Sequence, residues 1–451
     1  MKKRKILLIL ALMVLSVSLV FAGGKKEEPA PAPEKKVEEA AKKPYEGVKM
    51  RLAAMADQFA EYMKVLTERY KAETGADIQV DILGYVELYQ KMTQDYSTDT
   101  KQYDLATVDI VWSGEFAVKG WTVDLTPLIE RDKAEINTND IYPVMWAMGS
   151  WEDKQVAFPM SGYANSLIYR KDLFNDPAEK KAFMDEYGYE LAPPETMSQM
   201  RDMATFFTRK DKNLYGLVAN GARGPAVAQD WMEYMRSFGG QILDENGNVV
   251  IDSKECLESL KFFVDIFDKW APPGAIGYWW DDRETAYRTG QAVMQSSWSI
   301  ARAGYEDPSI SKVVGKTGMA APPKVEGKET FYGVGGWGIG INADISKERQ
   351  EIAWDFIKWL TSPEVQKDWL LHDGQPIRIS TVKDPELNQK MPWLPVMHKV
   401  YQNGDGDYRP RVPEYNEIQS ILGLRVNQAI THELSAEEAI SKAAEEIKAL
   451  Y

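Results

Sequence analysis

The chain has 451 residues and a formal net charge of −14, which excludes a nucleic-acid binder as its main role because it would be repelled by phosphate backbones. One cysteine leaves no disulfide to form within the chain, and three widely separated histidines give no metal-ligand motif. We therefore expect no metal and no cofactor, in a chain long enough for two or three domains with cores of their own.

The amino-terminal end has the pattern of a secretory signal. Four basic residues at positions 2–5 precede an apolar run at 6–22 that ends in the small residue Ala22. We therefore expect a signal peptide over 1–22 with cleavage after Ala22. A retained signal anchor is the alternative. Because Gly23 follows the expected cut, the mature protein has no amino-terminal cysteine to carry a lipid. We expect an exported protein, in the periplasm or outside the cell, without that anchor.

Residues 23–46 are rich in Lys, Glu, Pro and Ala, which predicts a disordered spacer. The fold is expected to begin near Val48. Apolar residues at strand spacing in 48–55, 76–83 and 104–112 alternate with two helical patterns, the first of them ended by Gly75. This order predicts a parallel βαβ sheet covered by helices.

Ligands of such sheets lie beyond the carboxyl ends of the strands. The rule brings Asp57 and Gln58, after the first strand, near Asp109 and Trp112 at the end of the third. These four residues are the first candidates for a binding site.

A second region, from about 160 to 322, mixes strands and helices. We expect a strand that begins near Ser166, helices around 200–207 and 231–238, and a strand over 291–298 that ends at Trp298. The stretch 244–255, DENGNVVIDSKE, predicts a turn, a short strand and a helix capped by Asp252 or Ser253. It imitates a calcium loop, but position six is Val249 instead of glycine, so the turn is the better reading.

Residues 331–342, FYGVGGWGIGIN, contain the G-x-G-x-x-G spacing of dinucleotide-binding loops. Such a loop must follow a strand and open a helix, whereas Gly338 leads into an expected strand, 339–342. We therefore predict no nucleotide site. We expect these glycines to allow a close approach of the backbone to either a ligand or a neighbouring strand.

The chain has fourteen tryptophans, and several fall where turns are expected. An indole presents a flat apolar face that can stack on the C–H face of a sugar while carboxylates and amides bond its hydroxyls. Burial in a core or between lobes is the alternative for each of them. The set of turn tryptophans is Trp112, Trp151, Trp231, Trp279, Trp280, Trp298 and Trp337.

Asp281 and Asp282 follow two of these tryptophans, and a glycosidase could pair carboxylates there. Adjacent positions do not, however, place two carboxyls across a scissile bond, and there is no G-x-S-x-G.

Seven stretches in order make the chain resemble a known family. They are FAEYMKVLTERYKAETGADIQVDILGYVELYQKM, VAFPMSGYANSLIYRKDLF, RSFGGQILDENGNVVIDSKECLESLKFF, QAVMQSSWSIA, GVGGWGIGIN, AWDFIKWLTSPEVQKDW and HDGQPIR. Together they resemble the extracellular solute-binding proteins, family 1, the maltose-binding-protein-like sugar-binding subunits of ABC importers.

The resemblance implies an α/β periplasmic-binding-protein fold of type II, in which crossing strands join two lobes around a ligand cleft. It implies a first lobe from residues 45–160 and 325–378, and a second from 161–324 and 379–451. The crossings would lie near 160–165, 321–324 and 377–380.

The resemblance also implies where ligand binds. Trp298 matches a position that stacks on sugar, Gly336 and Trp337 a loop of the first lobe, and Tyr163 and Asn165 a crossing. Arg378 matches a late position in the cleft, and Asp57, Gln58, Asp109 and Trp112 match first-lobe loops. Trp231, Trp280 and Asp281 complete the candidate set on the aromatic and carboxylate argument above.

We therefore expect a monomeric, non-enzymatic binder that captures a mono- or oligosaccharide and delivers it to membrane permease subunits. Two alternatives stay open. The same fold could bind a polyamine, an amino-acid derivative or a polyol phosphate, although a phosphate would call for more cationic candidates than Arg378. A secreted glycan hydrolase or lyase is the other.

Overall fold

A computed structural model describes residues 43–98 and 100–451. The expected signal peptide and the expected spacer up to residue 42 lie outside the described residues. Residues 43–46, which the sequence assigns to the spacer, already pack on the fold: the backbone amide of Tyr45 donates to the carbonyl of Thr74 at 2.9 Å, and its hydroxyl donates to Asp355. Lys43–Tyr451 form one compact unit.

The strands of this unit are β1 (Lys49–Met55), β2 (Asp77–Leu83), β3 (Leu105–Asp109), β4 (Ser150–Trp151), β5 (Lys154–Gln155), β6 (Phe158–Arg170), β7 (Tyr215–Val218), β8 (Ala292–Trp298), β9 (Thr317–Ala320) and β10 (Val334–Ile341).

The helices are α1 (Ala60–Thr74), α2 (Tyr85–Ser97), α3 (Ser113–Lys119), α4 (Thr126–Ile136), α5 (Pro143–Met148), α6 (Lys171–Phe174), α7 (Pro177–Tyr187), α8 (Met197–Phe207), α9 (Pro225–Ser237), α10 (Lys254–Asp265), α11 (Trp280–Arg288), α12 (Arg302–Glu306), α13 (Lys347–Leu360), α14 (Pro363–Leu371), α15 (Ile379–Val382), α16 (Pro385–Lys390), α17 (Leu394–Gln402), α18 (Tyr415–Ile430) and α19 (Ala436–Lys448).

The first three strands form the predicted parallel βαβ arrangement. β1 pairs in parallel with both β2 and β3, so the first strand of the chain lies between the other two. Helix α1 buries the stripe of Met63, Leu66 and Tyr70 against the sheet, and Gly75, with φ of +89°, ends it in the left-handed conformation that favours glycine. The helical and strand periods of this region therefore predict its structure correctly.

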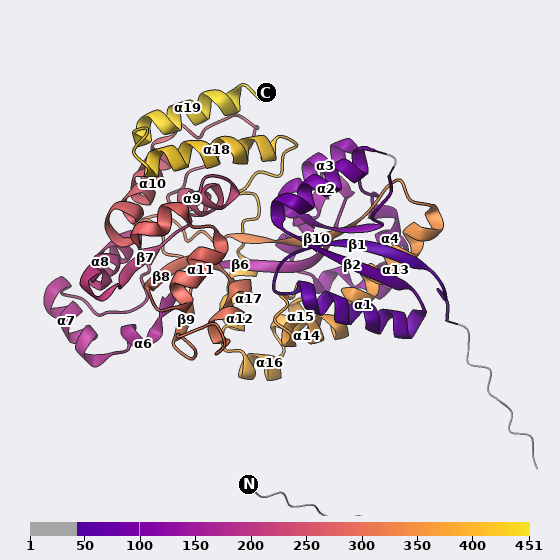
Figure 1. The fold of residues 1–451 in the computed structure, drawn as a ribbon, viewed down its shortest axis with the longest axis horizontal. Helices are drawn as coiled ribbons and strands as arrows, with labels where there is room; N and C mark the ends of the chain where they lie inside the picture. The colour runs from indigo at the N-terminus through magenta and orange to yellow at the C-terminus, as the bar shows by residue number, and fades with distance from the viewer. Residues whose placement is uncertain (1–42, 99) are drawn as a thin grey trace, which may run out of the picture. The chain divides into compact units, whose positions relative to one another are not determined.

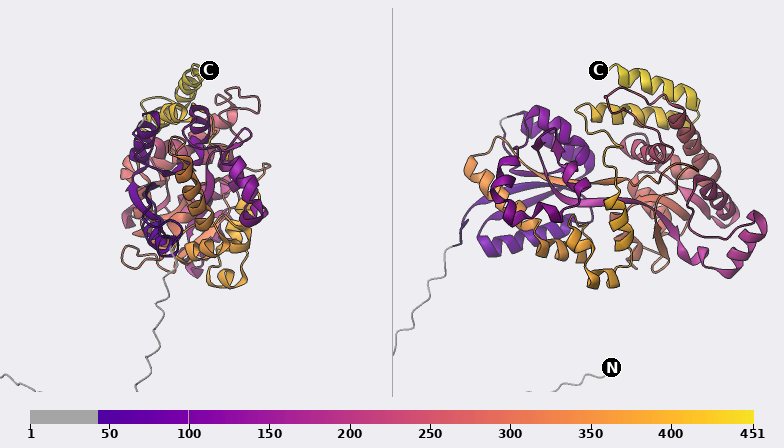
Figure 2. Two further views of the ribbon diagram at one scale, coloured as in Figure 1. Left: turned by 90° about the vertical axis from the view of Figure 1, so that its right-hand side faces the viewer. Right: turned by 180° about the vertical axis from the view of Figure 1, so that it is seen from behind.

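The sheet continues through strands that are distant in sequence. Its order is β2-β1-β3-β10-β6-β8-β7, and β9 also pairs with β6. β10 lies antiparallel between β3 and β6, although more than 160 residues separate it from either. We call β1, β2, β3 and β10 with their helices the first lobe, and β7, β8 and β9 with theirs the second lobe; Figures 1 and 2 show the two groups on either side of β6.

β6 belongs to both lobes. Its first half, from Phe158 to Ala164, pairs with β10, and its second half, from Asn165 onward, pairs with β8 and β9. A strand of 13 residues that is hydrogen-bonded in this way connects the lobes at the middle of the sheet. The exact residue ranges of the two lobes stay a prediction.

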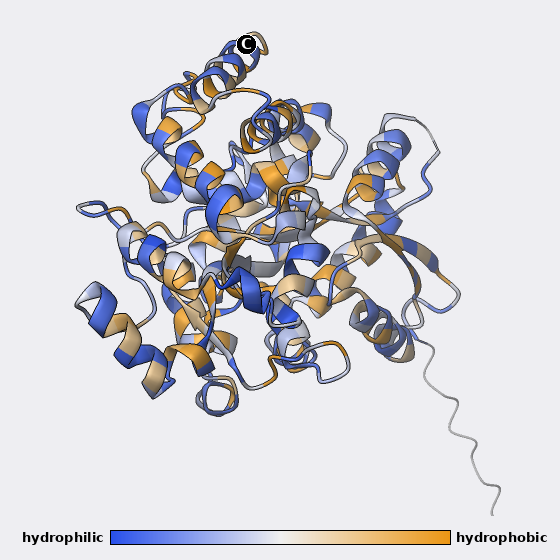
Figure 3. Cartoon of the chain, turned by 60° about the vertical axis from the view of Figure 1, so that its left-hand side comes forward, coloured by the Kyte–Doolittle hydropathy of each residue, from blue (hydrophilic) through white to orange (hydrophobic). Residues whose placement is uncertain are grey.

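Hydrophobic residues follow the strands and the helix faces that cover them, and hydrophilic residues lie on the outer faces (Figure 3). The helix starts follow local signals in the sequence. Ser346 caps α13, Ser362 caps α14 with Pro363 at its first position, and Ser253 caps α10. None of the described helices is long and apolar enough to span a membrane.

The stretch from Asp244 to Glu255 differs in part from the expectation. The expected short strand before α10 is replaced by a single bridge between Leu243 and Val249. The turn is present, because the Asp244 carboxylate accepts the backbone amides of Asn246 and Asn248 at 2.9 and 2.8 Å. Those amides occupy an oxygen that a calcium site would need, and the described residues contain no acidic, His or Cys cluster suited to a metal.

The glycines of β10 allow a close approach of two strands. A Cβ on Gly336, whose φ is +150°, would lie 2.2 Å from the backbone oxygen of Ser161 in β6. A Cβ on Gly338 would lie 2.7 Å from the Cβ of Ala157. The close approach of β10 to β6 and to Ala157 is therefore one reason for these glycines.

Candidate functional site

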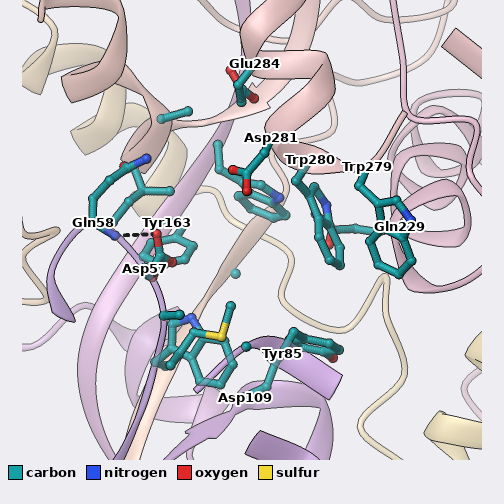
Figure 4. Close-up of a pocket in the computed structure, with 18 of the residues that line it drawn as sticks. Asp57, Gln58, Tyr85, Asp109, Tyr163, Gln229, Trp279, Trp280, Asp281 and Glu284 are labelled. Atoms are coloured by element: carbon teal, nitrogen blue, oxygen red, sulfur yellow. Dashed lines mark hydrogen bonds between the residues drawn. The ribbon is translucent and has the colours of Figure 1, made fainter. Parts of the chain in front are cut away.

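A cavity of about 590 Å³ lies at the carboxyl-terminal edge of the parallel strands. The ends of β1, β3 and β8, the start of β10 and the middle of β6 form its floor, as the topology of α/β sheets predicts. The start of α2 and the residues around the start of α11 form its sides (Figure 4). Both lobes therefore contribute to the lining.

The polar and aromatic lining residues are Asp57, Gln58, Tyr85, Glu87, Asp109, Tyr163, Gln229, Trp279, Trp280, Asp281, Arg283, Glu284, Ser297, Trp298, Trp337 and Arg409.

A row of aromatic rings runs along one side of the cavity. Trp337 meets Tyr85 with ring centroids 6.1 Å apart, and Tyr85 of the first lobe meets Trp280 of the second at 5.8 Å. Trp279 continues the row at 5.5 Å from Trp280 and is 37% exposed, so it stands at the rim. The rings form a broad apolar surface of the kind that buries the C–H face of a polyhydroxylated ligand.

Asp57 lies on the floor opposite this row. Its carboxylate accepts a hydrogen bond from the Tyr163 hydroxyl at 2.7 Å and one from the Gln58 backbone amide at 2.8 Å. Burial raises the pKa of Asp57, and the charge of nearby Asp281 raises it further. Burial also raises the pKa of Tyr163 well above its ordinary value, so this hydroxyl stays a donor.

The other end of the floor holds Asp109 and Arg409. The Arg409 guanidinium lies 4.0 Å from the Asp109 carboxylate and 5.6 Å from the ring centroid of Trp298. Burial raises the pKa of Asp109, and the charge of Arg409 opposes that shift. The Nε of Arg409 is buried and has no acceptor. Because Arg409 lines the cavity, its guanidinium can donate to a ligand oxygen there.

A buried polar network joins lining residues of the second lobe. Arg283 donates to Asp230 at 2.7 Å and to Glu284 at 2.8 Å, and Ser297, next to Trp298, donates to Glu284 at 2.7 Å. A network in which each charged group has a partner holds its members in fixed orientations. The side chains at the end of β8 are therefore positioned before any ligand arrives.

The structure brings nine of the thirteen sequence-predicted site residues to this cavity. They are Asp57, Gln58, Asp109, Tyr163, Trp280, Asp281, Trp298, Gly336 and Trp337. The other four, Trp112, Trp231, Asn165 and Arg378, are not part of its lining.

Two of these four are core tryptophans. Trp112 is fully buried behind the lining, where its ring meets Trp337 at 5.6 Å and Phe116 at 6.0 Å. Trp231 is fully buried in α9, and its Nε1 donates to Ser259 at 3.1 Å. Both follow the core alternative, because each indole is fully buried.

The remaining two are buried polar residues with protein partners. Asn165 donates to Glu233 at 2.6 Å and to Ser296 at 3.1 Å, in the second lobe. Arg378 donates to the backbone carbonyls of Thr361 at 2.6 Å and Ile136 at 3.0 Å. Both side chains therefore have protein partners outside the lining of this cavity.

The sequence prediction named Trp279 only among the turn tryptophans. The other polar and aromatic lining residues that it missed are Tyr85, Glu87, Gln229, Arg283, Glu284, Ser297 and Arg409. Tyr85 could have been found, because it follows the end of β2 at the same sheet edge as Asp57. No sequence pattern marks Arg409 as a site residue. It lies in the loop 403–414, between α17 and α18, late in the chain.

The chain belongs to the family of bacterial extracellular solute-binding proteins, whose model matches residues 53–367. Its resemblance to solved structures is strong. An ABC transporter solute-binding protein from Agrobacterium radiobacter K84, crystallised with ribitol, is 43% identical, with a TM-score of 0.84 over 91% of this chain and 100% of that chain.

Maltose-bound MalE3 of T. maritima is 29% identical, with a TM-score of 0.79 over 90% of this chain and 100% of that chain. A curated protein of Sinorhizobium fredii, named as a probable amino-acid ABC transporter periplasmic-binding protein, is 25% identical over 88% of both chains. These findings confirm the family and the two-lobed periplasmic-binding-protein fold expected from the sequence. The family is one of transport binding proteins and not of enzymes.

Proposed function

We propose that this protein is the solute-binding subunit of an ABC importer, that it binds a polyol or a small sugar in the cavity between its lobes, and that it delivers this solute unchanged to a membrane permease. The observation that carries the proposal is the cavity itself, in which an aromatic row faces several carboxylates. The ribitol complex of the 43% identical relative and the maltose complex of the 29% identical one support this class of solute.

The lining has the chemistry that a polyhydroxylated solute requires. Trp280, Trp337 and Tyr85 offer apolar faces to C–H groups. Asp57 and Asp109 accept hydrogen bonds from hydroxyls, and the Arg409 guanidinium donates to hydroxyl oxygens. A volume of about 590 Å³ is in the range of small-molecule sites.

Closure of the lobes would follow from differential affinity. A solute that contacts both Tyr85 on the first lobe and Trp280 on the second stabilises the state in which they are close together, as in periplasmic binding proteins generally. The permease would then distinguish the loaded from the empty form by the rotation of the lobes. The lobe ranges given above, 45–160 with 325–378 and 161–324 with 379–451, belong to this proposal.

Export and release are part of the same proposal. Cleavage after Ala22 would free a chain whose first residue is Gly23, so the protein would be delivered without a lipid on an amino-terminal cysteine. It would work as a monomer, because one chain contributes both sides of the cavity. Mass spectrometry of the secreted protein would identify its first residue and show whether a lipid is attached.

The test is a thermal-shift and tryptophan-emission screen against ribitol, mannitol, tagatose, maltose and a phosphorylated polyol. We expect one or more of the neutral solutes to raise the melting temperature and change the emission, since a ligand that binds only the folded state stabilises it. NMR of the recovered solute should show it unaltered. If neither the polyols nor the sugars shift either signal, the proposal fails; a cleaved product would instead support the glycan hydrolase or lyase.

A further inference from the structure

The cavity has more negative charge than its own cations compensate. Five carboxylates line it, and Arg283 and Arg409 are the cationic residues among its described lining residues. Arg283 is already bonded to Asp230 and Glu284, and Arg409 lies beside Asp109. Glu87 forms an ion pair with Lys91 of the same helix at 3.5 Å. Asp57 and Asp281 are the lining carboxylates that form no ion pair within the described residues.

Asp57 and Asp281 lie close enough to interact. Asp57 follows β1 in the first lobe and Asp281 begins α11 in the second, and both are drawn facing the interior of the cavity (Figure 4). The negative charge of Asp281 raises the pKa of Asp57, because each carboxylate disfavours the charged form of the other. A positively charged group between them would reverse that effect.

The neighbouring groups favour such a cation and add hydroxyl recognition. Trp280 and Tyr85 present aromatic rings, whose faces attract an ammonium group. Arg409 lines the cavity, and its guanidinium can donate hydrogen bonds to a ligand hydroxyl oxygen. Ammonium recognition and hydroxyl recognition are therefore combined in one cavity.

From these contacts we infer that the preferred solute is a polyol or sugar that carries an amino group, held with its ammonium between Asp57 and Asp281 and with a hydroxyl oxygen at Arg409. This inference rests on the proposed function and narrows its solute class. The same charges disfavour anionic solutes, including sugar acids and sugar phosphates.

Three five-carbon ligands of equal length test the inference by calorimetry: ribitol, 1-amino-1-deoxyribitol and ribonate. We expect the amino compound to bind at least about tenfold more tightly than ribitol, because a charge-assisted hydrogen bond is stronger than a neutral one. Ribonate should bind more weakly than ribitol by a similar factor.

Two variants and a matched control locate the effect. Asp57→Asn and Asp281→Asn should each abolish most of the preference for the amino compound. Asp282→Asn removes the same charge one residue further along, outside the cavity, and its amide oxygen can still accept the Trp279 backbone amide, so the preference should be unchanged.

The outcomes separate the two levels of the proposal. Equal or weaker binding of the amino compound, with ribitol still bound, overturns the amino-group inference and leaves the solute-binding function intact. Binding of none of the three overturns the inference and removes ribitol-like polyols from the proposed function. A preference that survives in both Asp57→Asn and Asp281→Asn would also contradict the inference.

Discussion

The Arg409 guanidinium lies over the indole of Trp298, 5.6 Å from the ring centroid, and 4.0 Å from the Asp109 carboxylate. Trp298, which the sequence analysis predicts to stack on sugar, is therefore already in contact with a cationic side chain from late in the chain. That cation joins β3 of the first lobe to β8 of the second.

Arg409→Met should weaken the binding of ribitol, or of the best solute in the screen, by at least about tenfold, because a charged hydrogen-bond donor is lost. Calorimetry measures the change. Arg378→Met is the contrast: it removes the bonds to the Thr361 and Ile136 carbonyls outside the cavity, so it should lower the melting temperature and leave affinity unchanged. Equal affinity losses in both variants would contradict the placement of the site.

Adjacent glycines of β10 should respond differently to alanine. A Cβ on Gly335 would lie 2.9 Å from both Trp298 and the Arg409 guanidinium, so Gly335→Ala should displace these groups and weaken binding severalfold. A Cβ on Gly336 would meet the Ser161 backbone oxygen at 2.2 Å, so Gly336→Ala should chiefly destabilise the fold, by roughly 1–3 kcal/mol or more.

Chemical denaturation and calorimetry on both glycine variants separate the two effects. Gly277→Ala is the control, because a Cβ there meets nothing within 4 Å and the residue has no positive φ. Stability should be most affected in Gly336→Ala. A Gly336→Ala protein as stable as the Gly277→Ala control would refute the strand-packing role of this glycine.

Two tryptophans should behave in opposite ways. Trp280→Phe removes an indole from the aromatic row, so it should reduce the solute-induced change in emission and weaken binding by up to about tenfold. Trp231→Phe lies in the core and loses the bond to Ser259, so it should lower the melting temperature while the emission change persists. An unaltered emission change in Trp280→Phe would contradict its place in the site.

Stability should depend on pH through Glu233. Burial, then the charge of Asp230, raise the pKa of Glu233 from 4.5 to about 7. The folded protein therefore holds this proton more tightly than the unfolded chain does. The resulting stability is complete below about pH 4.5 and is lost as the pH rises through about 7, by at most about 3 kcal/mol.

Glu233→Gln keeps the shape of this side chain and cannot lose a proton, so its melting temperature should fall less than that of the wild type between pH 5 and pH 8. Glu68→Gln, an exposed carboxylate on α1, serves as the matched control and should follow the wild-type profile. Identical profiles for Glu233→Gln and the wild type would rule out Glu233 as the titrating group.

The sequence predicts those features that depend on local pattern. Alternating and helical periods place β1 to β3 with their helices, and the strand-edge rule then brings Asp57 and Asp109 together. The sequence alone could not show that Trp231 lies in the core while Trp298 lines the cavity, because an indole is equally suited to a core and to a stacking surface. The sequence could not predict Arg409 as a lining residue, because its loop is positioned by contacts with residues distant in sequence, such as those of Asp405 with Arg236 and of Arg411 with Ser150.

The position of β10 has a consequence for the order in which the molecule can be assembled. A growing chain that has passed Arg170 already contains β1, β2, β3 and β6, yet β3 and β6 do not touch in the sheet, because residues 334–341 fill the place between them. Until that late segment is synthesised, two facing strand edges stay open near the middle of the protein. Fragments that stop before residue 334 should therefore be poor folders and ready substrates for chaperones and proteases.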